Sequence, residues 1–149
     1  MPIPAPFKAR ATLLERLTDY EPRQKAEPHP LRVLSREGLK ESVRRNLDWI
    51  LNARTPLTGD EFDHDELTVI HYGIPDFGGY SPENPEDRKR LARRIRRAVR
   101  FFEPRLRDVR VTVGPQMENE RTLRVIIIHA VMVEADIREP VIFKTILQG

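Results

Sequence analysis

The stretch TLRVIIIHAVMVEAD (Thr122–Asp136) decides the fold, because from Val125 to Val133 its apolar residues occupy both faces of an extended chain. A strand that is apolar on both faces is typical of the middle of a sheet. Before it, DVRVTV (108–113) alternates valines with polar residues, as a half-buried strand does. After it, EPVIFKTILQG (139–149) has a proline at its start, where a strand tolerates one. The short connections predict an antiparallel meander.

Two helical stretches precede these strands. SREGLKESVRRNLDWILNAR (35–54) is expected to begin at the N-cap Ser35, and SPENPEDRKRLARRIRRAVRFF (81–102) to begin at Pro85 and to end before Pro104. Their apolar stripes are Leu39, Val43, Leu47, Ile50 and Leu51 in the first and Leu91, Ile95, Ala98, Val99 and Phe102 in the second. Helices followed by strands predict an α+β fold: a small antiparallel sheet of three or more strands packed against two main helices.

The first thirty residues are rich in proline and differ from the rest of the chain. Within them, ATLLERLTDY (11–20) has Leu13, Leu14 and Leu17 on one helical face, but it is too short to be a stable helix by itself in water. We expect this face to pack on its own domain, with a partner protein as the alternative. The predicted organisation is a proline-rich leader with a short amphipathic helix over residues 1–30 and an α+β domain over residues 31–149.

Composition places the chain among soluble globular proteins, since 39% of its 149 residues are hydrophobic and 33% are charged. The net charge is only +3, but the pI of about 9.5 leaves acidic or polyanionic partners open. The absence of cysteine excludes disulfides and thiolate metal sites. No apolar stretch is long enough to span a membrane, so we predict a cytoplasmic protein without direct membrane insertion.

The strongest charge signal is a basic run on the second helix, formed by Arg88, Lys89, Arg90, Arg93, Arg94, Arg96, Arg97 and Arg100. Such a surface could neutralise the phosphates of a nucleic acid. However, the run has no interleaved aromatic residue for base stacking, and no helix-turn-helix or RNA-binding signature accompanies it. A solvated face, or a face that docks on an acidic protein, is the favoured interpretation. A nucleic-acid-binding module stays an alternative.

The acidic stretch GDEFDHDE (59–66), with His71 after it, contains residue types that bind metals. Its spacing matches neither a calcium-binding EF-hand loop nor a zinc-binding helix, so we predict a polar loop and no metal. Glu103, beside two phenylalanines, would have a raised pKa if it were buried. No second catalytic carboxylate and no nucleotide-binding motif can be identified, so we predict no cofactor, no small-molecule substrate and no enzyme activity. A cell-wall-degrading enzyme stays an alternative.

Glu103 poses a question of its own. It follows the second helix, where the backbone already presents negative partial charge and a cation is favoured. The carboxylate should cost a few tenths of a kcal/mol, up to about 1, unless another group binds it. We therefore expect a specific partner for Glu103.

Four segments in order resemble a known family: LLERL (13–17), SVRRNLDWILNAR (42–54), HYGIPDF (71–77) and FFEPRL (101–106). They are similar to the baseplate-wedge and sheath-initiator family of contractile injection machines. Its bacterial member is TssE of the type VI secretion system, and its phage members lie in contractile tail baseplates. The family's Glu-Pro-Arg triplet matches Glu103, Pro104 and Arg105. Its Tyr-Gly-x-Pro-Asp signature matches Tyr72, Gly73, Pro75 and Asp76, and its Asn-x-Arg signature matches Asn52 and Arg54.

The resemblance implies a structural role. Such a protein joins the wedge subunits of a membrane-docked baseplate and offers the template on which the contractile sheath begins. Its expected partners are other baseplate wedge subunits and sheath proteins. In that setting Arg105 would bind a partner's carboxylate and Glu103 a partner's cation. The alternative is a salt bridge between groups of this chain.

The last predicted strand has no following element to cover its outer edge. Val141, Phe143 and Thr145 alternate there with Ile142, Lys144 and Ile146, and only Lys144 guards the edge with charge. We predict that a partner strand pairs with this edge, and the resemblance makes that strand an arm of the first sheath ring. The alternatives are a strand inside the sheet or an edge covered by the leader. The predicted interaction residues are thus Glu103, Pro104, Arg105, Tyr72, Asp76, Arg54, Val141 and Phe143.

Overall fold

The structure is a computed structural model that describes residues 9–17 and 33–147. The chain divides into two compact units, and the boundary falls between Val43 and Arg44, inside helix α2 (Arg36–Asn52). The predicted boundary at residue 30 lies outside the described residues and stays a prediction. No helix in the described ranges is long and apolar enough to cross a membrane.

The first unit contains a two-residue antiparallel pair, β1 (Ala9–Arg10) with β2 (Val33–Leu34), and the five-residue helix α1 (Leu13–Leu17). The buried side chain of α1 is Glu15, whose Oε2 accepts hydrogen bonds of 2.9 Å from the backbone N–H and the hydroxyl of Thr12. All three leucines of the predicted apolar face are exposed. Within the described residues of the first unit they are thus not buried, and the expectation that they pack on the domain stays a prediction.

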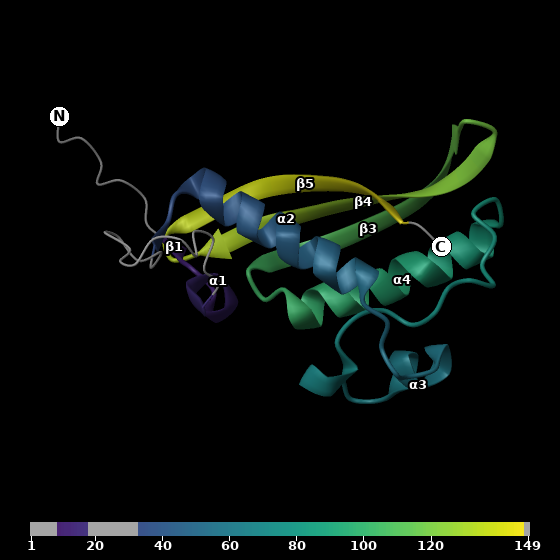
Figure 1. The fold of residues 1–149 in the computed structure, drawn as a ribbon, viewed down its shortest axis with the longest axis horizontal. Coiled ribbons are helices and arrows are strands. Elements are labelled where there is room, and N and C mark those ends of the chain that lie inside the picture. The colour runs from purple at the N-terminus through teal and green to yellow at the C-terminus, as the bar shows by residue number, and fades with distance from the viewer. Residues whose placement is uncertain (1–8, 18–32, 148–149) are drawn as a thin grey trace, which may run out of the picture. The chain divides into compact units, whose positions relative to one another are not determined.

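The second unit is built on a three-stranded antiparallel sheet in the order β3-β4-β5 (Figure 1). The strands are β3 (Leu106–Glu118), β4 (Arg121–Glu134) and β5 (Ile137–Leu147). The predicted middle strand is thus confirmed. One face of β4 is fully packed, with Ile126, Ile128, Ala130 and Met132 buried. Between Arg107 and Arg110 the register of β3 shifts, and Asp108 adopts a positive φ of 51° at this bulge.

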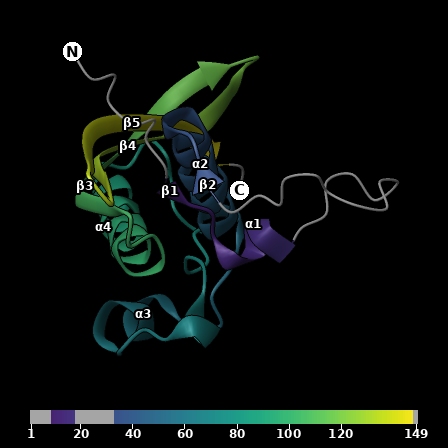
Figure 2. The same cartoon turned by 90° about the vertical axis from the view of Figure 1, so that its left-hand side faces the viewer.

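Both main helices form where the sequence predicts them: α2 follows Ser35, whose hydroxyl accepts from the backbone N–H of Gly38, and α4 (Pro85–Phe102) has Pro85 in its first turn. Their apolar stripes are buried apart from Phe102, which is half-buried. Helix α4 packs on β3, and Figure 2 shows α4 between the sheet and the short helix α3 (Gly59–His64). The α+β prediction is confirmed.

The segment that connects α2 to α4 is more ordered than the predicted polar loop. Residues 59–64 form α3, because Thr58 and Glu61 make a capping box in which Glu61 Oε2 accepts from the Thr58 backbone at 2.7 Å. Phe62, in the middle of the acidic stretch, is fully buried and anchors the helix. A short 3₁₀ helix, η1 (Val69–His71), follows α3 in the same segment.

Candidate protein-interaction surfaces

The carboxylate of Glu103 is bound by groups of the same chain. Glu103 caps the C-terminal end of α4, and its side chain is only 1% exposed. Its Oε1 accepts hydrogen bonds from the backbone N–H and the Nε of Arg105, at 3.2 and 2.7 Å, while Oε2 accepts from Arg105 Nη2 at 2.7 Å. This two-pronged contact is the strong geometry for an arginine and a carboxylate. Arg105 thus supplies the cation that the helix end lacks.

A second donor to the same carboxylate comes from α2. Asn46 Nδ2 donates to Glu103 Oε2 at 2.8 Å and to the carbonyl of Phe102 at 3.2 Å. Asn46 Oδ1 in turn accepts from the hydroxyl of Tyr72 at 3.1 Å. Burial, and after it the charge of Glu103, raises the pKa of Tyr72 above its ordinary value, so the hydroxyl keeps its proton for this bond. The network joins α2, the connecting segment and the end of α4.

The Glu-Pro-Arg triplet therefore has the internal salt bridge that the sequence left as the alternative. Only Pro104 is exposed, and the guanidinium-bearing side chain of Arg105 is 11% exposed. The backbone carbonyl of Arg105 also accepts from the N–H of Val133 at 2.8 Å, which ties the triplet to β4. Partner binding by Glu103 and Arg105 stays a prediction, and it would require a partner to open this network.

The Asn-x-Arg and Tyr-Gly-x-Pro-Asp signatures lie side by side, where the end of α2 contacts the segment that connects α2 to α4. Ala53 and Thr55 exchange backbone hydrogen bonds of 3.1 Å with Ile74, so the end of α2 runs beside the connecting segment. Gly73 has a φ of +109°, and a Cβ there would lie 2.5 Å from the Ala53 carbonyl oxygen, so glycine is required. Arg54 donates to the carbonyl of Leu51 at 3.0 Å, which satisfies the last turn of α2.

Two exposed side chains remain at this junction. The guanidinium of Arg54 lies 4.4 Å from the centre of the Phe77 ring, a cation–π contact. Asp76 accepts a hydrogen bond of 3.1 Å from the backbone N–H of Gly78, as in a turn stabilised by an aspartate. Both side chains lie at the surface, where a partner could reach them.

An ion pair between the buried Arg94 and the partly buried Asp63 holds α3 against α4. Arg94 is 5% exposed, and its Nε and Nη2 donate to the carboxylate of Asp63 at 2.8 to 3.1 Å, while its Nη1 contacts the hydroxyl of Tyr80. Burial alone would raise the pKa of Asp63, but the hydrogen bonds and charge of Arg94 hold that pKa below its ordinary value. A Cβ on Gly59 would lie 2.3 Å from the guanidinium of Arg94, so a glycine at the start of α3 permits the approach.

The acidic stretch thus serves as the internal partner of the basic run. Within residues 9–17 and 33–147, no three histidine or carboxylate side chains lie close enough together to hold a metal ion. Arg94 and Asn46 were not singled out from the sequence. The available signal was their position: each falls within the apolar stripe of its helix, three residues after Leu91 and Val43, respectively.

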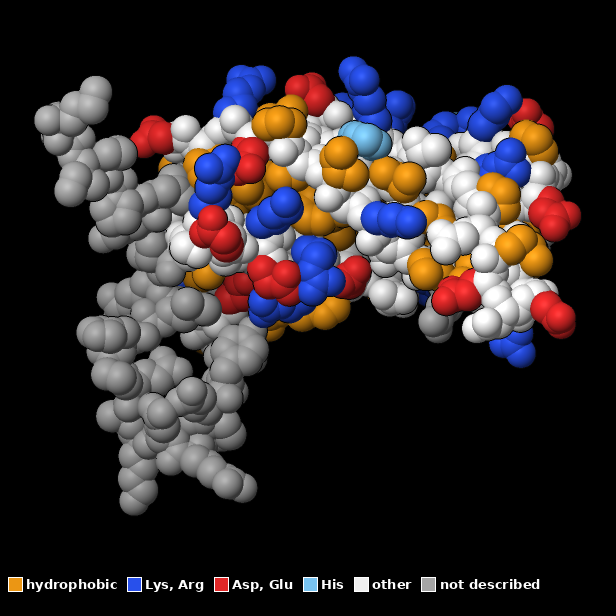
Figure 3. All heavy atoms as spheres, turned by 90° about the horizontal axis from the view of Figure 1, so that it is seen from above, with side chains coloured by type: hydrophobic (Ala, Val, Ile, Leu, Met, Phe, Trp, Pro, Cys, Tyr) orange, Lys and Arg blue, Asp and Glu red, His pale blue; other side chains and the backbone are white. Residues whose placement is uncertain are grey.

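The last strand of the sheet, β5, lies at its edge. Among the described residues β5 pairs with β4 alone, so a strand inside the sheet is excluded there. Val141 and Phe143 are buried, at 3% and 7% exposed, so their side chains face the core rather than a partner. The exposed apolar side chains of β5 are Ile142 and Ile146, at 60% and 41%. Figure 3 views the molecule from above the sheet and shows hydrophobic side chains exposed between basic ones.

The comparisons with known proteins agree with this architecture. Residues 37–136 match the family described as Baseplate wedge protein gp25. A solved structure described as "The baseplate complex from the type VI secretion system" contains a chain of similar fold, with a TM-score of 0.52 and 19% sequence identity over 76% of this chain and 97% of that chain. A search of curated proteins found no match.

Because the family match covers well over half of its residues, this chain belongs to the baseplate wedge protein family. Its role is structural, as a component of a baseplate. The resemblance to this family is thereby confirmed. Three of the four segments quoted above lie within the matched residues, and LLERL (13–17) lies outside them.

Proposed function

We propose that the chain joins wedge subunits in the baseplate of a type VI secretion system and that strand β5 is the template on which the first sheath ring forms. The family membership and the similar fold of a chain in a type VI baseplate complex support the choice of machine. Its partners are then other wedge subunits and sheath proteins, on the cytoplasmic side of a membrane-docked baseplate.

The template proposal rests on the direction in which the backbone N–H and C=O groups of β5 point. Pro140 pairs with Val131 and has no N–H, so this pair is a non-hydrogen-bonded pair of the antiparallel ladder. The register runs on without a shift, so Ile142, Lys144 and Ile146 also belong to non-hydrogen-bonded pairs. Their N–H and C=O groups therefore point away from β4, toward the open edge.

The side chains of the same three residues suit an incoming strand. Ile142 and Ile146 are exposed on either side of Lys144, so a partner strand would gain apolar contacts as well as main-chain hydrogen bonds. Lys144 is the only charge between them and discourages pairing with a second copy of the same edge. Sheath arms of varied sequence could pair here, because backbone hydrogen bonds do not depend on the side chain.

In this proposal Glu103 and Arg105 of the Glu-Pro-Arg triplet stabilise the fold and do not contact a partner directly. Opening a buried ion pair leaves an uncompensated charge, so a partner would have to replace every bond that Glu103 now accepts. We assign Glu103 and Arg105 the task of fixing the end of α4 relative to β4. The exposed candidates for wedge contacts are then Pro104, Asp76 and Arg54.

An enzymatic role finds no supporting geometry at Glu103. General acid catalysis needs a carboxyl group within hydrogen-bond reach of the substrate. The carboxylate of Glu103 is instead buried and bonded to Arg105 and Asn46. Clear turnover of peptidoglycan by the purified protein, lost in Glu103→Gln, would contradict the structural assignment.

The decisive experiment replaces one amide of the β5 edge. Lys144→Pro removes a donor that faces the open edge and leaves the ladder with β4 intact, whereas Lys144→Gln removes the charge and keeps the donor. We expect baseplates to form with both variants, and sheaths to fail only with Lys144→Pro, as counted by fluorescence microscopy of labelled sheath. Normal sheath assembly on a folded Lys144→Pro protein would overturn the template proposal.

A further inference from the structure

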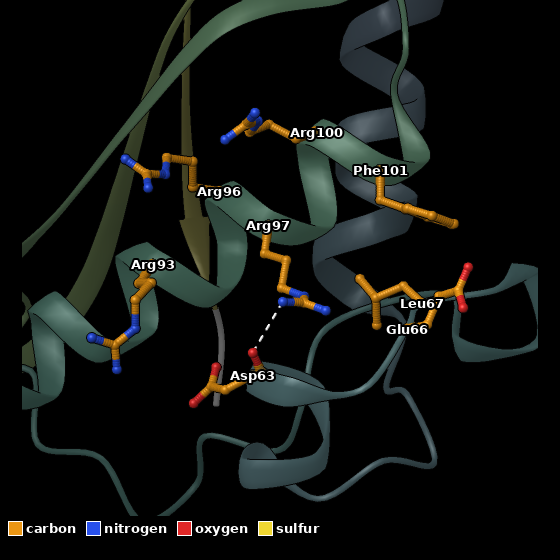
Figure 4. Close-up of a pocket in the computed structure, with 8 residues that line it drawn as sticks. All are labelled: Asp63, Glu66, Leu67, Arg93, Arg96, Arg97, Arg100 and Phe101. Atoms are coloured by element: carbon orange, nitrogen blue, oxygen red, sulfur yellow. Dashed lines mark hydrogen bonds between the residues drawn. The ribbon is translucent and has the colours of Figure 1, made fainter.

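A groove of about 560 Å³ lies between the C-terminal half of α4 and the segment that follows α3 (Figure 4). Four arginines of α4 line it, together with two apolar side chains, Leu67 and Phe101. The four are Arg93, Arg96, Arg97 and Arg100. Residues of the same groove on the α3 side include two carboxylates, Asp63 and Glu66.

The arginines of this groove fall into two classes. Arg97 is bound within the protein: its Nη1 donates to the backbone carbonyl of Asp63 at 3.0 Å (Figure 4). Its Nη2 donates to the backbone carbonyl of Asp65. Arg96 and Arg100 are exposed and form no hydrogen bond or ion pair with any residue that the structure describes. The carboxylate of Asp63 is occupied by Arg94, so it does not neutralise them.

The positive charges of Arg96 and Arg100 repel their neighbours on the helix, and no carboxylate of the described residues compensates this repulsion. Arg96 lies four residues before Arg100 and three after Arg93, and like charges at these spacings repel each other on a helix. Because no carboxylate of the described residues pairs with Arg96 or Arg100, their charges are available to a ligand outside this chain.

We propose that the groove binds an acidic segment of a partner protein, with carboxylates on Arg96 and Arg100 and one apolar side chain against Phe101. Arg93 and Arg100 are seven residues apart, so the basic row spans roughly 10 Å, which suits a short peptide with acidic residues about one helical turn apart. Phe101 is 46% exposed, and its ring packs edge-on against Phe102 at 4.9 Å, so it presents a firm apolar surface.

A peptide fits this groove better than a nucleic acid does. The exposed side chain of Glu66 also lines the groove, so a ligand has to keep its own negative charges away from it. A peptide with spaced carboxylates can do so, whereas a continuous row of phosphates cannot. Several arginines of the basic run are already engaged, since Arg94 and Arg97 bind groups of α3 and of the segment after it. What remains is a short basic row beside an apolar surface, which matches alternating carboxylate and apolar side chains.

The test uses the full chain and a defined probe. A fluorescein-labelled peptide of twelve residues, with glutamates three or four positions apart and one central leucine, is titrated with the protein and followed by anisotropy in 50 mM and 300 mM NaCl. We expect saturable binding that weakens at the higher salt concentration. The double variant Arg96→Glu/Arg100→Glu should weaken binding at least tenfold, and Phe101→Ala about fivefold.

The matched control lies on the same helix. Lys89→Glu/Arg90→Glu changes the net charge by the same amount but lies outside the groove, so binding should change less than threefold. Equal losses in the two double variants would reduce the effect to general attraction and overturn the proposal, as would no binding at 1 mM protein. Tighter binding of a single-stranded oligonucleotide through the same two arginines would overturn it in favour of nucleic acid. Circular dichroism confirms that each variant is folded, and the outcome is independent of the β5 edge.

Discussion

Arginines on or near the same helix are used in opposite ways. Arg94 is buried and Arg105 is largely buried, and each binds a carboxylate of this chain. Arg96 and Arg100 are exposed and bind no described residue. A charge taken out of water must be paired, so the buried arginines are part of the fold. An exposed charge has no such requirement, and we propose that the exposed arginines of α4 serve a ligand outside the chain. We apply the same reasoning to the amides of β5 that point away from β4 and pair with no described strand.

The largest loss of stability is expected when the ion pair between Arg105 and Glu103 is broken. Arg105→Ala leaves the carboxylate of Glu103 buried without its cation, which should lower the free energy of unfolding by about 3–5 kcal/mol. Glu103→Lys should lower the free energy of unfolding by a similar amount, because it places a second cation beside Arg105. Urea denaturation measures both. The exposed Arg107→Ala serves as control, and a loss for Arg105→Ala no greater than for this control would contradict the assignment.

The second largest effect concerns the pair that joins α3 to α4. Asp63→Asn removes the charge from the hydrogen bonds that Arg94 donates, so the free energy of unfolding should fall by about 1.5–3 kcal/mol at pH 7. Asp136→Asn, an exposed aspartate, is the control.

The same pair predicts a pH dependence. Because the pKa of Asp63 is lowered in the folded protein, its contribution is complete above the unfolded value of about 3.9 and is lost as the pH falls below it. The gap in stability between the native protein and Asp63→Asn should therefore shrink in a denaturation series from pH 6 to pH 3. A gap that stays constant over this range would show that the ion pair does not stabilise the fold.

The smallest effect has the opposite sign. Arg96→Gln relieves repulsion with Arg93 and Arg100, so the free energy of unfolding should stay level or rise by about 0.2–0.5 kcal/mol for each relieved pair. Arg97→Gln, one position along, loses its bonds to the carbonyls of Asp63 and Asp65 and should lower stability. If Arg96→Gln destabilised the protein as much as Arg97→Gln, the distinction between bound and unbound arginines would fail.

The sequence predicts features that depend on neighbouring residues, but not contacts between residues that are far apart in the chain. Hydrophobic periodicity is local, so it located α2, α4 and all three long strands, including the middle position of β4. The expectation that a specific group binds Glu103 was met by Arg105 of the same chain, which was the alternative to a partner's cation. The identity of Asn46 as its second donor was not predicted, because the two residues are 57 positions apart and no local pattern links them.

The acidic stretch shows the same limit in another form. Its spacing excluded the known metal motifs, but the pairing of Asp63 with Arg94 depends on how α3 folds back on α4. On β5, Val141 and Phe143 were predicted as contact residues, and their side chains are buried, whereas those of Ile142 and Ile146 are exposed. A period of two fixes which residues share a face, but tertiary packing decides which face is inward.

The most direct test of the proposal that a partner strand pairs with β5 is amide hydrogen exchange along this strand. Exchange is measured by NMR in the isolated chain and by mass spectrometry in the assembled baseplate. In the isolated chain the amides of Ile142, Lys144 and Ile146 should exchange quickly, and those of their odd-numbered neighbours slowly, because only the latter bond to β4. In the assembly with sheath, the three fast amides should become protected. If they stay fast there, or are already slow in the isolated chain, β5 is not the strand that a partner pairs with.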